Sequence, residues 1–550
     1  MAQAGIDTLQ DELIYRLDLH TIVPVKDIFV LTNSFVKLET VDYVGTKPLQ
    51  GFSLDESHPF PFKFINPCPP TDANPEELAA KQLQEDPSVE ADIQEGQHVL
   101  HGHDACAQVD AFFRYGFMEN SASVLAKSTF MTPDLTSLTS NKVFVLLGVT
   151  SELGPAKSLL QIEGCTVLGI CRGDSGDAAS AKRMQELIDF VTFHAPDNTT
   201  LKCVKGGADL LTQGPQIIQW ILDNTKESQE IVVCPLATTS VGEEALRVAV
   251  AMDCIVQRIS RQRRKTIVCQ YISPASIMVL PPAASTMAEQ RLASRPTIEK
   301  WASSYTRWCE SSVVSVNNDY CIINGIVTAL GPEYSMAKLL QQWRCMLTYY
   351  RDHRIVATPF APPTKTASTI PAVAAALEGI HYFEPLIALP TASASTLMAA
   401  VMLSQIQFMN RPLPDMDENP FTIFWDGAVH GGVWTCPYTL ESISTINWVL
   451  GKAWYAPSSS TNNSSTNDDD GENGGGATMT TTTTTTMTAT IPEKARVPKV
   501  EATNDENGDN ATAKGQPPKD KMERAIEILE AGSEYGKPMP DCVKERLEFL

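Results

Sequence analysis

The sequence predicts an α/β protein built on a doubly wound parallel sheet. From residue 141 onward, apolar runs such as NKVFVLLG, CTVLGICR and EIVVCPLA alternate with longer segments whose apolar residues recur at helical spacing, such as AASAKRMQELIDFVTFH. Strands that are apolar throughout are typical of a parallel sheet with helices on both faces. The repeated alternation of strand and helix therefore indicates a Rossmann-like arrangement.

The expected elements follow one another in a regular order. Strands are expected at 141–148, 165–172, 199–204, 230–237, 266–273 and 354–362. Helices are expected at 152–164, 178–194, 215–224, 243–260, 331–343, 371–379 and 395–409. The segment from about 274 to 330 is less regular, and we interpret it as part of an enlarged substrate region.

Composition divides the chain into four parts. Residues 1–138 form an amino-terminal extension with an irregular pattern and no assigned fold, and 139–456 form the Rossmann-like domain. Residues 457–518 contain polar low-complexity runs such as TTTTTTMTAT, which cannot bury a core and predict a disordered linker. Residues 519–550 regain apolar periodicity, so we expect a short helical segment that docks on the body or binds a protein partner.

Charge and composition exclude several classes of protein. The net charge of -22 and the pI near 4.9 argue against nucleic-acid binding and against binding to anionic membranes. The apolar stretch 385–403 contains Pro390 and several hydroxyls, so it predicts a buried helix rather than a membrane span. The amino terminus lacks the pattern of a signal or transit peptide, and the 13 cysteines show no Cys-x-x-Cys pair. We expect reduced core cysteines and a cytoplasmic protein.

A glycine-bearing turn, GVTSELG, directly follows the first strand. Glycine allows close backbone approach, and amides at a helix amino end attract phosphate, so Gly148, Thr150, Ser151 and Gly154 are candidate cofactor-binding residues. Glu152 stands where the usual dinucleotide pattern has its middle glycine. Its carboxylate either faces a pyrophosphate and repels it, or points to solvent.

Arg172 ends the second strand. An acidic residue there usually pairs with a ribose hydroxyl, whereas an arginine suits a 2′-phosphate, so Arg172 favours NADP over NAD. The alternative is a solvated loop arginine, and nearby Asp174 blurs the distinction.

Tyr334 and Lys338 stand four apart in GPEYSMAKLLQQW, at the start of an expected helix. Residues four apart share a helix face, and a positive neighbour favours the phenolate form of a tyrosine. The pair is therefore a candidate for general acid or base catalysis, against the alternative of a half-buried ring beside a solvated amine.

In their order along the chain, these motifs resemble the short-chain dehydrogenase/reductase family over residues 141 to about 370. The resemblance adds Asp209 after the third strand, Ser273 or Ser276 after the fifth, and the run HRIVATPFAPPTKT as the sixth strand with its cofactor-capping turn. It implies that Thr364 or Thr366 contacts the nicotinamide carboxamide.

Two departures from the family leave alternatives open. PLATTS stands in place of the family's Asn-Asn-Ala-Gly element, and Ser273 lies much farther before the tyrosine than the family's serine does. Either the segment between them is an insertion such as a substrate lid, or Thr328 or Asn324 takes the role of the serine, or the role is absent.

The resemblance implies an NADP(H)-dependent oxidoreductase acting on a carbonyl or alcohol of a small substrate. Tyr334 would exchange a proton with the substrate oxygen, Lys338 would hold the nicotinamide ribose, and Ser273 or a substitute would orient the substrate. Family members are commonly dimers or tetramers, so a homo-oligomer is one expectation. Competing classes are a non-catalytic dinucleotide-binding sensor or interaction protein, and an epimerase or dehydratase on the same fold.

Three further clusters have structural and functional interpretations. HVLHGHDAC gathers potential zinc ligands, but its spacing favours a polar loop, and no metal residue is assigned. RISRQRRK is expected to be a solvated connection at the end of a helix. His430, in FWDGAVHGGVWTCPY, is expected in a core turn, with a substrate-closing loop as the alternative.

Overall fold

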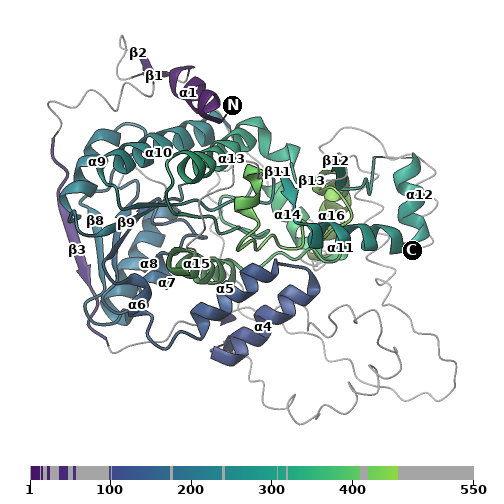
Figure 1. The fold of residues 1–550 in the computed structure, drawn as a ribbon, viewed down its shortest axis with the longest axis horizontal. Coiled ribbons are helices and arrows are strands. Elements are labelled where there is room, and N and C mark those ends of the chain that lie inside the picture. Colours follow the sequence, from purple (N-terminus) through teal and green to yellow (C-terminus); the bar gives the residue numbers. More distant parts are fainter. Residues whose placement is uncertain are drawn as a thin grey trace, which may run out of the picture. The chain divides into compact units, whose positions relative to one another are not determined.

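A seven-stranded, mostly parallel sheet organises the protein and confirms the predicted α/β class (Figure 1). The computed structural model describes residues 2–12, 14–16, 22–24, 36–47, 54–56, 98–100, 102–173, 178–237, 242–305, 307–316, 320–408 and 419–455. The expected linker 457–518 and carboxyl-terminal segment 519–550 lie outside the described residues. No described helix is both long and apolar enough to cross a membrane.

The sheet has the strand order β14-β10-β9-β6-β7-β8-β3. Neighbouring strands are parallel except at one edge, where β3 runs antiparallel to β8. The strands are β3 (Thr40–Val44), β6 (Lys142–Leu147), β7 (Thr166–Ile170), β8 (Thr200–Val204), β9 (Glu230–Pro235), β10 (Thr266–Cys269) and β14 (Val356–Ala357).

Both faces of the sheet are buried along its central strands β6, β9 and β10, which is why these strands are largely apolar. Alternate residues of β6 divide between two cores: Phe144 and Leu146 face one, while Val143, Val145 and Leu147 face the other. The first face is covered by α4 (Gly102–Tyr115), α5 (Asn120–Phe130), α7 (Ala156–Leu159), α8 (Ala178–His194) and α15 (Thr391–Phe408). The second is covered by α1 (Ala2–Glu12), α9 (Gly214–Asp223), α10 (Glu243–Gln262) and α13 (Gly331–Met346).

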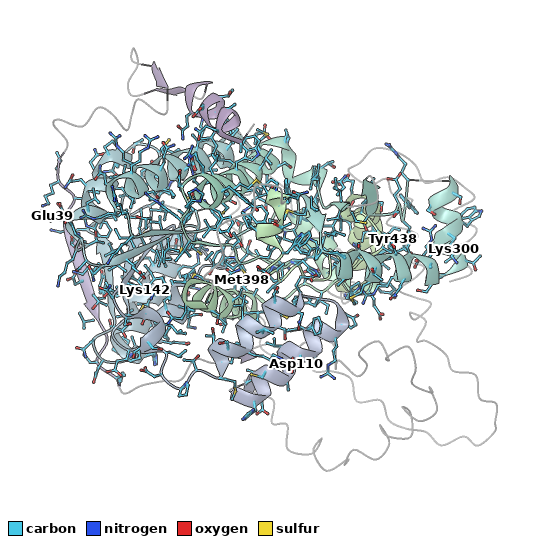
Figure 2. The ribbon with its side chains drawn as sticks, viewed as in Figure 1. Glu39, Asp110, Lys142, Lys300, Met398 and Tyr438 are labelled. Carbon is cyan, nitrogen blue, oxygen red and sulfur yellow. The ribbon has the colours of Figure 1, made fainter. Side chains whose placement is uncertain are left out.

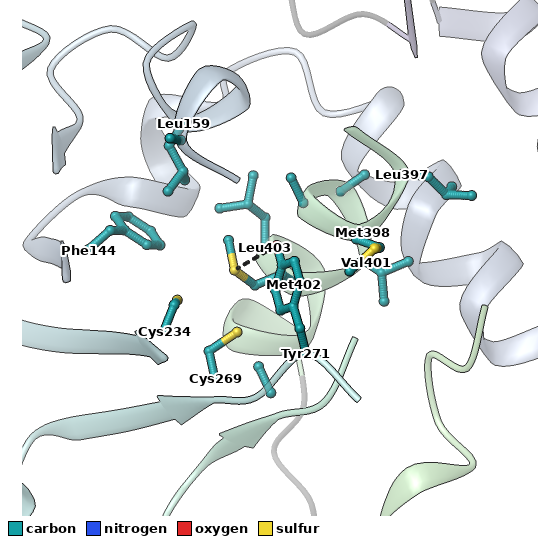
Figure 3. Packing of buried hydrophobic residues seen from close by; sticks show 14 of the residues in the cluster. Phe144, Leu159, Cys234, Cys269, Tyr271, Leu397, Met398, Val401, Met402 and Leu403 are labelled. Carbon is teal, nitrogen blue, oxygen red and sulfur yellow. Dashed lines mark hydrogen bonds between the residues drawn. The ribbon is translucent and has the colours of Figure 1, made fainter. Parts of the chain in front are cut away.

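The first core is centred where the sheet meets α15. Figure 3 shows Phe144 of β6, Cys234 of β9 and Cys269 of β10 near Leu159 of α7 and residues of α15. The hydroxyl of Tyr271 reaches Sδ of Met402 at 4.0 Å, the contact dashed in that view. Burial raises the pKa of the Cys269 thiol and of the Tyr271 phenol, so both groups remain protonated. The described cysteines are free thiols, most of them buried.

Residues of the amino-terminal extension are built into this body. β3 adds the antiparallel edge strand, where Glu39 and Lys205 pair at 2.8 Å (Figure 2). Helix α5 packs along α15, and α1 packs on α13. The other described elements of this region are β1 (Ile14–Arg16), β2 (Ile22–Pro24), β4 (Leu54–Glu56), β5 (His98–Leu100) and α6 (Thr136–Thr139).

The segment after β10 forms a small antiparallel sheet with the order β11-β13-β12. It packs with residues 419–439 in a third core that contains Met278, Ile323 and Trp434. The elements of this part are β11 (Ile277–Leu280), α11 (Pro282–Ser294), α12 (Thr297–Tyr305), β12 (Val313–Val316), β13 (Tyr320–Asn324) and η2 (Thr328–Leu330). The last group is η3 (Leu347–Arg351), α14 (Pro371–Gly379), η4 (Ile380–Tyr382), η5 (Pro420–Phe424) and α16 (Leu440–Tyr455).

The expected long helix at 152–164 is wrong. The chain after β6 continues as turns and forms only the four residues of α7, which begin after Pro155. Gly154 and Cys165 bound the segment, and Leu159, Leu160 and Ile162 are all buried. The connection to β7 therefore consists of buried turns around one short helix, and not of an amphipathic helix of several turns.

Candidate functional site

The strand order reverses at one point of the sheet, between β6 and β9. From β6 the chain moves outward through β7 and β8, and from β9 it moves the other way through β10 and β14. In open α/β sheets, ligands bind at the carboxyl ends of the strands beside such a reversal. The predicted site residues Gly148, Arg172 and Asp209 all follow carboxyl ends of these strands.

The turn after β6 requires glycine at its first position. Gly148 has φ +104, and a Cβ there would lie 2.5 Å from the Ala237 nitrogen, in the segment after β9. The amides of Gly148 and Val149 donate to the Ile170 carbonyl at 2.9 Å each. Ser151 and Gly154 then close the turn by successive backbone hydrogen bonds, Ser151 N to Gly148 O and Gly154 N to Ser151 O. The turn after β6 and the segment after β9 are thus in van der Waals contact at Gly148 and Ala237.

Hydroxyls and a guanidinium surround the turn. The Thr150 hydroxyl lies 3.1 Å from that of Ser180 on α8, and the Ser395 hydroxyl of α15 donates to the Gly154 carbonyl at 2.7 Å. Arg183 of α8 donates through Nε to the Thr150 carbonyl at 3.0 Å. These contacts fix α8 and α15 against the turn.

Glu152 points neither at the core nor freely into solvent. Its Oε1 accepts from Arg183 Nη1 at 3.2 Å, and its Oε2 accepts from the Ala367 amide at 3.0 Å. Ala367 follows Thr366, whose amide donates to the Thr369 hydroxyl at 2.9 Å. The structure therefore joins the turn after β6 to the predicted cofactor-capping loop, but through a carboxylate.

Arg172 and Asp209 are brought together as an ion pair. Arg172 Nε lies 3.2 Å from Asp209 Oδ2, and its Nη2 lies 2.5 Å from Oε1 of Glu244, in the first turn of α10. The Glu244 bond is the main cause that raises the pKa of Arg172. Asp209 Oδ1 also accepts from the amides of Leu211 and Thr212 at 2.8 and 3.0 Å. The guanidinium is thus partnered by two carboxylates.

Tyr334 and Lys338 share a face of α13, as their spacing predicts. Both side chains are partly buried, and Lys338 Nζ lies 5.3 Å from the centroid of the Tyr334 ring. The ammonium therefore lies over the ring in a cation–π contact. Helix α13 and then η3 precede β14 along the chain, and Gln342, in the carboxyl-terminal half of α13, contacts Ser276 in the segment after β10.

The candidate hydroxyls of Ser273 and Ser276 lie beside α13, nearer to its carboxyl end than Tyr334 is. Ser276 Oγ accepts from Gln342 Nε2 at 2.9 Å and donates to the Ser273 carbonyl at 3.1 Å. Ser273 Oγ accepts from the Ala275 amide at 3.2 Å. Gln342 is eight residues after Tyr334, which is about 12 Å along a helix.

Thr328 and Asn324, the alternatives to the serine, also have hydrogen-bond partners. The Thr328 amide and hydroxyl donate to the Glu441 carboxylate at 3.0 and 2.6 Å, and Asn324 Oδ1 accepts from the Ile326 amide at 3.1 Å. Within the described part of the chain, no hydrogen bond joins any of these side chains to the phenol of Tyr334. A substrate-orienting hydroxyl beside the phenol is therefore not preformed.

His430 lies in a core turn, as expected, and not in a lid. It is fully buried, stacks on Trp434 with ring centroids 5.0 Å apart, and accepts from the Trp434 amide through Nδ1 at 3.4 Å. Its Nε2 lies 3.4 Å from Glu119 Oε1, close enough for electrostatic contact but in poor hydrogen-bond geometry. Burial is the main cause that lowers the pKa of His430, so the ring is neutral at pH 7.

The histidine-rich stretch is not the polar loop that its spacing favours. His98 belongs to β5, and His103, Asp104 and Cys106 lie on α4, where Asp110 pairs with Lys127 of α5 at 2.5 Å (Figure 2). Among the described residues, no three His, Cys, Asp or Glu side chains gather as metal ligands. The basic run near Arg261 ends α10, as expected.

Sequence reasoning missed several residues of this edge: Ser180, Arg183, Glu244, Gln342 and Ser395. Each contacts the site from a helix that is remote in sequence, and each looks like an ordinary polar helix residue. Only Glu244 could have been recognised from the sequence, because acidic residues in a first helical turn are favoured by the helix dipole.

No family model matches the chain, and no curated protein is significantly similar to it.

Proposed function

We propose that the carboxyl edge of the sheet binds a dinucleotide and that the protein is an NADP(H)-dependent oxidoreductase of the short-chain type. One observation carries this proposal. In chain order, the parallel strands β8-β7-β6-β9-β10-β14 read 3-2-1-4-5-6, the common order of Rossmann-like dinucleotide-binding sheets. The turn that requires Gly148 lies at the reversal of that order.

The residues of the edge suit an anionic cofactor in part. Gly148 lets the turn after β6 pack against the Ala237 backbone at the reversal, and the Thr150 and Thr366 hydroxyls offer donors to phosphate or carboxamide oxygens. Arg172 supports NADP over NAD, but a 2′-phosphate must compete with Asp209 and Glu244 for its guanidinium. A bound nicotinamide would supply or accept the hydride.

The proton is assigned to Tyr334. A phenol can donate a proton to a carbonyl oxygen as that oxygen gains charge, and a phenolate can remove one from an alcohol. Lys338, whose Nζ lies 5.3 Å from the ring centroid, would hold the nicotinamide ribose beside the phenol. The substrate is then a small carbonyl or alcohol compound. Free buried thiols support a reducing, cytoplasmic location.

Substitution of the tyrosine tests the reaction. In the full chain, Tyr334→Phe removes one hydroxyl and keeps the ring under Lys338, so NADPH binding should persist while turnover over a panel of aldehydes, ketones and alcohols falls by at least about 100-fold. Tyr349→Phe, in η3 beyond the end of α13, is the control and should retain activity. Unchanged turnover in Tyr334→Phe would refute the catalytic assignment.

A non-catalytic dinucleotide sensor is the second candidate. The hydrogen bonds of Ser273, Ser276, Thr328 and Asn324 favour it, because each candidate orienting group already has a partner away from Tyr334. A sensor would bind NADPH, and neither the wild-type chain nor any variant would turn over any member of the panel.

A further inference from the structure

An internal carboxylate bridges the two segments expected to hold a cofactor. Glu152 accepts from Arg183 Nη1 at 3.2 Å and from the Ala367 amide at 3.0 Å. Arg183 is itself anchored, since its Nε donates to the Thr150 carbonyl at 3.0 Å. One guanidinium and one backbone amide, from elements far apart in sequence, thus converge on a single pair of oxygens.

This donor set is one that also recognises phosphate. A guanidinium presents its N–H groups in a planar fork that matches the oxygens of a carboxylate or a phosphate, and a backbone amide adds a donor with a fixed direction. Further hydroxyls stand near both donors. Thr150 pairs with Ser180 at 3.1 Å beside Arg183, and Thr366 pairs with Thr369 at 3.0 Å beside Ala367. The Glu152 side chain therefore fills an anion cradle, defined here as Arg183 and the Ala367 amide.

The anion cradle lies at the edge of the sheet where a ligand is expected to bind. Glu152 belongs to the turn at the reversal of strand order, and Ala367 belongs to the loop that follows β14. The side chains of Arg183 and Glu152 are 29% and 22% exposed, so solvent and solutes reach both groups. Partly exposed ion pairs of this kind contribute little stability. An incoming anion can therefore replace the carboxylate without unfolding the turn.

We propose that Glu152 is a tethered competitor for a phosphate group: its carboxylate occupies the cradle of Arg183 and the Ala367 amide, and a phosphate-bearing ligand displaces it. This inference rests on the proposed dinucleotide site and specifies which groups meet the pyrophosphate. Glu152 then weakens binding of any phosphate-bearing ligand, so that the site responds only to high ligand concentrations. Arg183 acts as the ligand's partner once Glu152 has left.

Neutralising the competitor should release the cradle. Glu152→Gln keeps the length of the side chain and removes its charge, so dissociation constants for NADPH and for inorganic pyrophosphate should fall at least about tenfold relative to the wild-type chain. Adding Arg183→Gln to Glu152→Gln should remove that gain, because the cradle then lacks its cation. Glu186→Gln, on the same helix as Arg183 and with its side chain 61% exposed, removes an equal charge and should bind as the wild type does.

Isothermal titration of the full-length variants with NADPH and with pyrophosphate separates the outcomes. Equal affinities of wild type and Glu152→Gln for both probes would overturn the competitor while leaving NADPH binding, and with it the proposed function, intact. A gain for pyrophosphate alone, with no variant binding NADPH, would support the cradle and overturn the dinucleotide proposal. Absence of binding of either probe to Glu152→Gln would overturn the competitor. Glu152→Ser replaces Glu152→Gln if the latter does not give a cooperative thermal transition.

Discussion

Arg344 of α13 and Asp253 of α10 form a bidentate ion pair in the core between their helices. Nε and Nη2 of the arginine lie 2.5 and 2.7 Å from the two carboxylate oxygens, and both side chains are 3% exposed. Gln10 of α1 adds a third contact, donating to Asp253 Oδ2 at 3.1 Å. The pair fixes how α13, which carries Tyr334 and Lys338, lies on α10.

Breaking this pair should be costly. Asp253→Asn leaves the Arg344 guanidinium buried without a counter-charge, so the free energy of unfolding should fall by about 3–5 kcal/mol. Asp189→Asn, on the exposed side of α8, is the matched control and should cost less than about 0.5 kcal/mol. Urea denaturation of both variants measures the difference. A loss below about 1 kcal/mol for Asp253→Asn would contradict the buried pairing.

Any side chain at Gly148 should destabilise the protein by more than backbone strain alone, because it would also clash with Ala237. Gly148→Ala places a Cβ 2.5 Å from the Ala237 nitrogen at φ +104, whereas Gly164→Ala introduces a Cβ at φ +69 with no atom within 4 Å. The control should therefore lose about 1 kcal/mol from backbone strain alone. Gly148→Ala should lose at least twice as much. Thermal and urea unfolding of the two variants compare them directly, and equal losses would mean that the two turns are not in contact.

The central sheet was predictable because its signal is local. Each strand from β6 to β10 is an apolar run between helices, and Phe144 or Val145 is buried whichever face it points to. The edge strand β3 was not predictable, since its alternating burial pattern is weak and its partner β8 lies far away in sequence. The length of α7 was overpredicted because Leu160 and Ile162 are buried in turns that follow the helix, and apolar residues alone do not separate a buried turn from a helix.

The candidate site was predictable only in outline. The spacing of Tyr334 and Lys338 and the need for glycine at position 148 are local properties, and the structure agrees with both. The contacts of Glu152 with Arg183 and Ala367, and of Arg172 with Glu244, join residues that only the folded chain brings together. Sequence offered two positions for the Glu152 carboxylate, a pyrophosphate and solvent, and neither describes its actual partners.

Acid should destabilise the protein partly through His430. Because burial lowers the pKa of this histidine from its ordinary value of 6.5, the unfolded chain takes up the proton at a higher pH than the folded chain does. Its contribution to stability is therefore complete above about pH 6.5 and is lost as the pH falls toward the folded-state pKa, by about 1.4 kcal/mol for each pH unit between the two values.

His430→Gln removes this titration. Urea unfolding at pH 7.5 and at pH 5.0 should show a larger drop in stability for the wild-type chain than for the variant, whatever other groups contribute, because those groups are common to both. An identical drop in the two proteins would mean that His430 is not buried as a neutral ring beside Trp434 and Glu119.

Binding of dinucleotide at the carboxyl edge of the sheet can be tested by thermal unfolding of the full chain with NADPH or NADH. A ligand that binds only the folded state raises stability by about 2.7 kcal/mol at 100 times its dissociation constant. We predict a higher unfolding midpoint with NADPH, a smaller rise with NADH, and a larger NADPH effect in Glu152→Gln. An unchanged midpoint with both dinucleotides, in the wild-type chain and in Glu152→Gln, would contradict a dinucleotide site.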